Sequence, residues 1–133
     1  MSDEDTPLRD RPYDIRERLF VFACDVVLAA QKMHSRSSVA AALCPNLVTA
    51  ATSAASNAEE ADDASSTRDF VAKERIALRE LKESRLRLRV MQRAGYLDRE
   101  DYRLIEEALE LTRIIATIIR NRERATDTHS SRP

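Results

Sequence analysis

The side chains with the clearest chemical potential in this sequence are basic ones gathered between positions 79 and 93. Arginine carries a permanent charge and paired N–H donors, so a row of arginines can bind phosphate groups. No aromatic residue lies among them to stack on bases, which argues against recognition of a specific base sequence in a nucleic acid. We interpret them as a candidate nucleic-acid-binding strip, and solvated or mutually paired charges are the alternative. The strip comprises Arg79, Lys82, Arg85, Arg87, Arg89 and Arg93, with Arg120, Arg122 and Arg124 near the C-terminus as further members.

Carboxylates occur in groups that could serve acid–base chemistry or bind a metal: Glu59/Glu60, Asp62/Asp63, Glu80/Glu83 and Glu106/Glu107/Glu110. A di-iron bundle needs Glu-x-x-His sequences on two helices, and the only histidines are His34 and His129, which we place in a loop and a tail. The chain also lacks a glycine-rich phosphate loop and a nucleophile–histidine set. We therefore expect no enzyme, no metal and no cofactor.

A second set of polar residues lies partly on an alanine-rich helix face and partly on a solvated one. We interpret it as a structural polar motif, made of Ser53, Asn57, Glu60, Glu80 and Glu83. Polar groups on a buried face must find partners, so Ser53 and Asn57 are expected to form hydrogen bonds that fix helix register, and a ligand site is the alternative. Glu80 and Glu83 are expected to pair on a solvated face with neighbouring basic residues, namely Lys73, Arg79, Lys82 and Arg87.

The composition favours long helices. The 133 residues include one glycine and four prolines, 34% are charged and 5% aromatic, and a sheet protein would need more turn glycines and more aromatic residues. The net charge of −1 gives no global attraction to polyanions, so such binding depends on local charge. The N-terminus is acidic and polar, without a signal peptide, and no apolar run approaches the ~20 residues of a membrane span. We expect a cytoplasmic protein without a membrane partner.

The two cysteines, Cys24 and Cys44, lie in apolar helical surroundings without metal-ligand spacing. We expect both to be buried reduced thiols, with a disulfide or a metal as alternatives.

Apolar periodicity predicts four helices joined by short loops, which makes neighbours antiparallel. Ser66 or Thr67 should cap the third one and Gly95 should end it. Pro45 lies within the second, so we predict a kink there, with a break into two helices as the alternative. The helices are expected at about 14–34, 38–61, 68–94 and 98–124, and Asp98, with Asp101 three residues later, should cap the start of the last one. They form one bundle domain, residues 13–124, between disordered tails at 1–12 and 125–133.

The first and last helices carry more apolar residues than one buried stripe requires. Phe20, Val21 and Leu28 widen the arc of the first helix, and Leu109 and Ile114 lie off the inner face of the last. Apolar residues beyond one stripe often mark a subunit contact. The pattern indicates an oligomer.

Four segments resemble the four-helix-bundle proteins related to those encoded in 23S rRNA intervening sequences. They are Tyr13-Asp14-Ile15 with Arg18 and Phe22, the run Ser53–Ala61, the run Phe70–Arg85, and Gly95-Tyr96-Leu97. The similarity extends over residues 13–122. Departures are Ala51 and Ala55 where relatives usually have glycines, Pro45, and Glu74 in place of an apolar residue.

The resemblance implies an antiparallel, up-down four-helix bundle that assembles as a homopentameric ring. One branch of this superfamily serves diversity-generating retroelements as an accessory protein that binds a reverse transcriptase and RNA. Our first hypothesis is a non-enzymatic homo-oligomeric scaffold that binds RNA, DNA or a nucleic-acid enzyme through the basic strip. The alternative is a protein-interaction scaffold without nucleic-acid binding.

Overall fold

The computed structural model describes residues 15–130, with side chains as far as Asp127. It contains four α-helices and one short 3-10 helix: α1 (Ile15–His34), α2 (Ser38–Asp62), α3 (Thr67–Arg93), η3 (Arg99–Asp101) and α4 (Arg103–Ser130). No strand occurs in this part of the chain. The expected all-α fold with four long helices is confirmed. The expected tail at 1–12 and the helix start at Asp14 lie outside the described residues.

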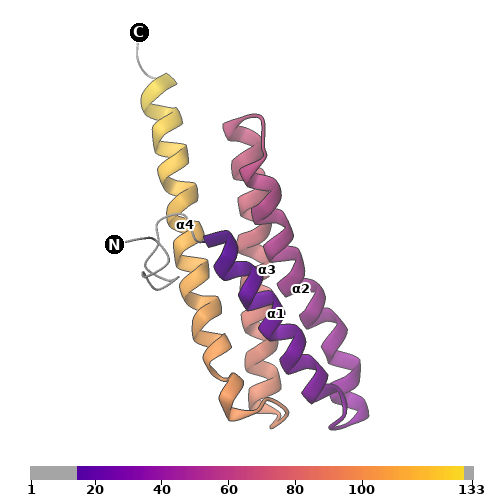
Figure 1. Ribbon diagram of the computed structural model, residues 1–133. Coiled ribbons are helices and arrows are strands. Elements are labelled where there is room, and N and C mark those ends of the chain that lie inside the picture. Colours follow the sequence, from indigo (N-terminus) through magenta and orange to yellow (C-terminus); the bar gives the residue numbers. More distant parts are fainter. Residues whose placement is uncertain (1–14, 131–133) are drawn as a thin grey trace, which may run out of the picture.

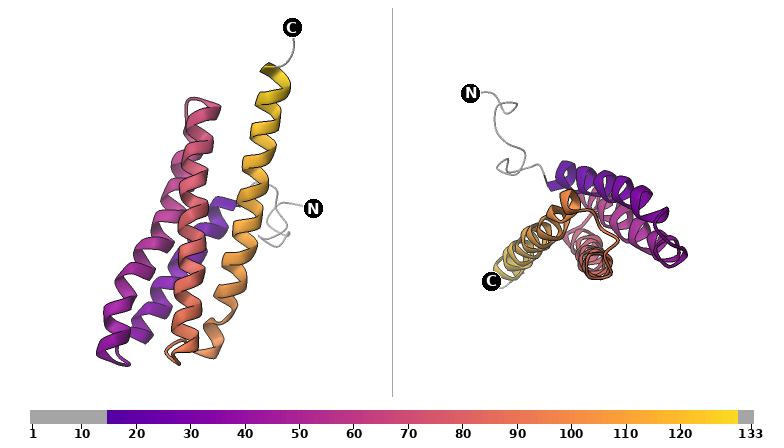
Figure 2. Two further views of the ribbon diagram at one scale, coloured as in Figure 1. Left: turned by 180° about the vertical axis from the view of Figure 1, so that it is seen from behind. Right: turned by 90° about the horizontal axis from the view of Figure 1, so that it is seen from below.

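Helices that follow one another in the sequence lie side by side. Figure 1 shows that successive helices run in opposite directions, with short connections between them. The contacts join α1 to α2, α2 to α3 and α3 to α4, whereas α1 packs only lightly on α4. Figure 2 shows α1 against α2 on one side of the molecule and α4 beside α3 on the other. The outer faces of α1 and α3 therefore point to different sides.

The core is built from large side chains of α1, α3 and α4 and small ones of α2. Phe22, Leu81 and Leu111 are fully buried, and α2 contributes mainly alanines such as Ala51 and Ala54. Small side chains let two helix backbones approach closely and pack densely. This explains why α2 and α3 form the most extensive contact of the molecule.

Local signals set both ends of α3. The Ser66 side chain accepts a hydrogen bond from the backbone N–H of Asp69 at 3.1 Å, which satisfies a donor of the first turn. Gly95 has φ of +84°, a left-handed conformation that glycine adopts without strain. The N–H of Tyr96 then returns to the carbonyl of Met91 at 2.9 Å. The predicted start and end of this helix are confirmed.

Helix α2 is continuous through Pro45, so the alternative of two separate helices is wrong. By length and hydropathy alone, α2 is the one described helix that could cross a membrane, contrary to our expectation that no segment approaches this size. Core helices meet the same criterion, and α2 lies between α1 and α3 with its alanine face buried.

The region after α3 differs from the prediction. Asp98 was expected to cap the fourth helix, but its side chain makes no capping hydrogen bond and residues 99–101 form η3 instead. Its carboxylate pairs with Lys32 and Arg36 of the α1–α2 region. At the other end, α4 continues to Ser130, past the predicted bundle boundary at residue 124. The span 125–130 is therefore helical rather than a tail.

One of the two cysteine assignments is wrong. Cys44 is buried, as predicted, and its thiol lies 3.5 Å from the carbonyl oxygen of Ala30. Burial raises the pKa of this thiol, because the thiolate would lose its hydration. Cys24 is free and exposed instead. It lies on the outer side of α1, since Phe22, Ala23 and Val26 occupy the inner side.

Candidate nucleic-acid interface

The outer face of α3 carries two parallel rows of basic side chains. Residues seven apart fall on the same side of an α-helix, because seven residues make nearly two turns. Both rows have this spacing. One row is basic at every position, and the other lies beside it with an apolar residue in the middle. All six basic residues are exposed. The first row is Arg68, Arg75, Lys82 and Arg89; the second is Arg79, Leu86 and Arg93.

Part of this basic face is free to bind a ligand. Arg75 donates to Glu123 of α4 at 2.7 Å, and Arg79 lies 3.7 Å from its neighbour Glu80. Lys82, Arg89 and Arg93 make no ion pair within the described part of the chain. These three cations therefore concentrate positive potential on the second half of α3, where phosphate could replace water without breaking existing pairs.

Two members of the predicted strip point elsewhere. Arg87 turns toward α2 and donates from Nη2 to Glu83 Oε1 at 2.8 Å. Arg85 is half-buried, and its Nε is buried without a hydrogen-bond partner among the described atoms. Neither side chain belongs to the two rows. The structure thus keeps four of the six predicted residues of α3 on one face and separates the other two from it.

The arginines of α4 lie beside the opposite end of α3. Glu123 pairs with Arg75, which places this part of α4 along the first turns of α3, away from Arg89. The guanidinium of Arg122 lies 3.9 Å from the centre of the Phe70 ring, a cation–π contact. Arg120 donates to Thr117 at 3.1 Å, and Arg124 is exposed. The nine predicted residues do not form a single strip.

Sequence reasoning missed Arg68 and Arg75 as members of the basic face. The signal was available, because both continue the seven-residue spacing of Lys82 and Arg89 toward the N-terminus. Grouping the basic residues by proximity in the sequence leaves both out. Spacing along a helix is the better guide, because neighbours in sequence point about 100° apart.

The polar motif does not come together. Asn57 donates to the carbonyl and hydroxyl oxygens of Ser53 at 2.9 and 3.2 Å, one turn away in α2. Glu60 pairs with Lys73 of α3 at 2.7 Å instead of joining them. The hydrogen bonds of Ser53 and Asn57 thus stay within α2. Glu80 and Glu83 pair with Arg79 and Arg87, as expected.

Three carboxylates near the bottom of the bundle have the spacing of a metal site: Asp98, Glu100 and Asp101. The ammonium of Lys32 lies 2.6 Å from oxygens of both Asp101 and Glu100. Hydrogen bonds with Asp101 first, and then Glu100, raise the pKa of Lys32 and keep it charged. A cation of the chain itself thus balances this acidic cluster.

Two further charged residues lie inside the bundle. Arg18 of α1 is buried against Glu107 and Glu110 of α4. Burial alone would lower its pKa, but the hydrogen bonds to these carboxylates outweigh that effect and raise it. Glu74 is only 4% exposed. Its burial and the nearby charge of Asp62 raise its pKa to about 7, although Arg122 acts in the opposite direction.

Comparison with known proteins agrees with this architecture. The model of one protein family, the 23S rRNA-intervening sequence proteins, matches residues 11–117. The chain belongs to this family. No match is found among proteins with curated functions.

A solved structure supports membership of the 23S rRNA-intervening sequence family at the level of the fold. It is a protein of unknown function from the S23 ribosomal protein family of Bacteroides thetaiotaomicron. The two chains are 26% identical and superpose with a TM-score of 0.72, over 79% of this chain and 97% of the other. The suspected family resemblance is confirmed.

Proposed function

We propose that this protein is a non-enzymatic, homo-oligomeric scaffold that binds RNA through the outer face of α3. The observation that carries the proposal is the exposed pair of basic rows, in which Lys82, Arg89 and Arg93 have no partner among the described residues. Phosphate is the ligand that such a row attracts. The family name adds a link to ribosomal RNA genes.

The proposal includes the assembly. We propose an up-down four-helix bundle that forms a homopentameric ring, supported by the exposed apolar side chains of α1, Phe20 and Leu28. Repeating the basic face around a ring would multiply the local potential of a chain whose net charge is only −1. A nucleic-acid enzyme, such as a retroelement reverse transcriptase, would be its protein partner in the cytoplasm.

The test compares two variants with the same loss of charge. Lys82→Ala with Arg89→Ala removes two cations from the basic face, whereas Arg99→Ala with Arg113→Ala removes two exposed cations elsewhere. Affinity for a labelled single-stranded RNA is measured by fluorescence anisotropy over a range of salt concentrations. We expect the first variant alone to weaken binding about tenfold or more and to reduce the salt slope by about 1.4.

Equal losses in both variants would show that binding follows net charge and not this face. No binding by the wild-type chain at low salt would contradict the RNA-binding proposal and favour a protein-interaction scaffold. Circular dichroism controls for folding, and light scattering shows whether the oligomer is intact.

A further inference from the structure

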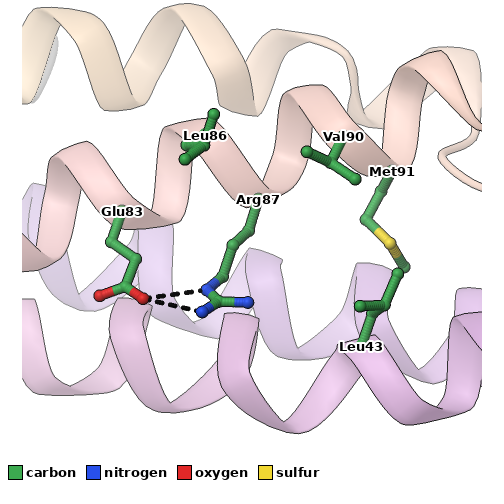
Figure 3. A pocket seen from close by; sticks show the side chains of 6 residues that line it. All are labelled: Leu43, Glu83, Leu86, Arg87, Val90 and Met91. Atoms are coloured by element: carbon green, nitrogen blue, oxygen red, sulfur yellow. Dashed lines mark hydrogen bonds and ion pairs between the residues drawn. The ribbon is translucent and has the colours of Figure 1, made fainter.

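A groove lies between α2 and α3, next to the basic face. Its volume is about 290 Å³, and its lining is largely apolar: Leu43, Leu86, Val90 and Met91, with Glu83 and Arg87. Figure 3 shows Met91 and Leu43 meeting between the two helices and the Glu83–Arg87 pair reaching from α3 toward α2. Leu86 is 57% and Val90 47% exposed. At roughly 30 Å³ per molecule, this volume corresponds to that of about ten waters.

The two sides of this groove differ in charge. On the far side of Leu86 and Val90 from α2 lie Lys82, Arg89 and Arg93, which have no ion-pair partner among the described residues. On the other side of the groove, α2 carries no charged residue from Ser38 to Ala58. The groove therefore suits an apolar element that carries negative charge or none. Phosphate has no partner in an apolar lining, so RNA suits the basic rows and not the groove itself.

The same chain presents a matching ridge on α1. Phe20, Cys24 and Leu28 are spaced four residues apart and all are exposed, with Phe20 and Leu28 each at 57%. Val21 lies beside them and is also exposed. A ridge of side chains four apart is the element that fits between ridges of the same spacing on another helix, and Leu86 and Val90 have this spacing.

The charges of α1 favour the same match. Its cations are held within the chain: Arg16 pairs with Glu59, Arg18 with Glu107, and Lys32 with Asp101. The ridge is left with Glu17, which is exposed and unpaired within the described residues. Apolar surface and a single negative charge thus face outward from α1, and apolar surface flanked by positive charge lines the groove.

Resting on the proposed oligomer, we infer that the α1 ridge of one copy docks into the α2–α3 groove of a second copy. Ridge and groove lie on different helices, so the contact joins unlike surfaces and each docked copy still offers one of each. Such a heterologous contact continues from copy to copy until a ring closes. This contact leaves Lys82 and Arg89, on the side of the groove away from α2, available to RNA.

The exposed cysteine in the ridge provides the test. In a Cys44→Ala background, Val90→Cys places a thiol in the groove, while Cys24 remains in the ridge. The matched control is Thr117→Cys on the exposed side of α4. Each purified variant is oxidised at low protein concentration with copper–phenanthroline and separated on a non-reducing gel. Light scattering on the unoxidised samples gives the native mass.

We expect Val90→Cys to form a ladder of disulfide-linked species beyond the dimer, which disappears when Cys24 is replaced by serine. The Thr117→Cys control and the Cys44→Ala parent should stay mainly monomeric on the gel. A Cys24–Cys24 dimer in the parent, a Val90→Cys product that stops at the dimer, or no cross-link in a native oligomer would overturn the docking inference and leave the proposed oligomer standing. A native monomer would overturn both.

Discussion

Arg18 and Glu107 form a two-point ion pair that joins α1 to α4. The guanidinium donates from Nη2 to Oε1 at 2.7 Å and from Nε to Oε2 at 3.3 Å. Arg18 is 6% exposed, so its charge is compensated by these carboxylates and not by water. α1 has few contacts with α4, and a second ion pair, Arg103 of α4 with Asp25 of α1 at 3.1 Å, is more exposed than this one.

Removing the arginine should therefore destabilise the fold. We expect Arg18→Ala to lower the free energy of unfolding by about 2–3 kcal/mol, slightly below the usual cost of breaking a fully buried pair, because Glu107 is partly exposed. Urea unfolding followed by circular dichroism measures the change. Arg16→Ala, which breaks exposed pairs with Glu59 and Asp62, should cost less than about 1 kcal/mol. Equal costs would show that the Arg18 pair has no special role.

Glu74 should make stability fall as the pH rises. Its pKa is about 7 in the folded chain, against an ordinary value of 4.5. Between these values the folded state keeps a proton that the unfolded state has released, so the contribution of Glu74 to stability is greatest below pH 4.5 and falls until about pH 7. The loss attributable to this carboxyl is of order 3 kcal/mol.

Glu74→Gln isolates this effect, because the amide does not titrate. The difference in unfolding free energy between wild type and Glu74→Gln, measured at pH 5 and pH 8, should shift by that amount in favour of the variant at the higher pH. A difference that is constant with pH would show that Glu74 has an ordinary pKa. Asp62 and Arg122, the charged neighbours, remain in both proteins.

Gly95 is expected to resist substitution through its backbone alone. A Cβ at this position would meet no atom within 4 Å, yet φ is +84°. We expect Gly95→Ala to destabilise the fold by about 1–2 kcal/mol, since a left-handed conformation is unfavourable for L-residues. Gly95→Asn should cost less because asparagine tolerates this region. Thermal unfolding compares the two, and equal losses would contradict the backbone explanation.

Pro45 leaves the continuous helix α2 with one backbone hydrogen bond fewer. Replacing this exposed proline with alanine provides an N–H for the carbonyl of Ala41. We expect Pro45→Ala to stabilise the fold by about 1–2 kcal/mol, because the helical gain exceeds the added freedom of the unfolded chain. The neighbouring exposed change Asn46→Ala should have an effect of about 0.5 kcal/mol. If urea unfolding shows that Pro45→Ala is less stable than the wild type, the proline ring makes contacts that outweigh the added backbone hydrogen bond.

The predictable parts of this fold are those with local causes. Ser66 and Gly95 act on their own turns, so both ends of α3 could be placed from the sequence. The start of α4 could not, because Asp98 and Asp101 are held by Lys32, which is more than 60 residues away in the chain. A distant ion pair replaces the cap that the local pattern favours.

The candidate site, like the fold, was predictable only where its causes are local. The basic spacing along α3 is visible in the sequence, but the outer side depends on where α2 and α4 pack. That packing turns Arg87 toward α2 and partly buries Arg85. The exposure of Cys24 was missed for the same reason, because apolar neighbours in a sequence do not show which side of a helix is covered.

Light scattering coupled to size exclusion, at low salt, with and without a mixed RNA pool, tests the central claim most directly. With chains of 15.1 kDa, the account predicts a mass of about 76 kDa that increases when RNA is added and returns to its original value at high salt. A ring whose mass is unchanged by RNA would contradict the RNA-binding function. A 15.1 kDa monomer would contradict the assembly as well.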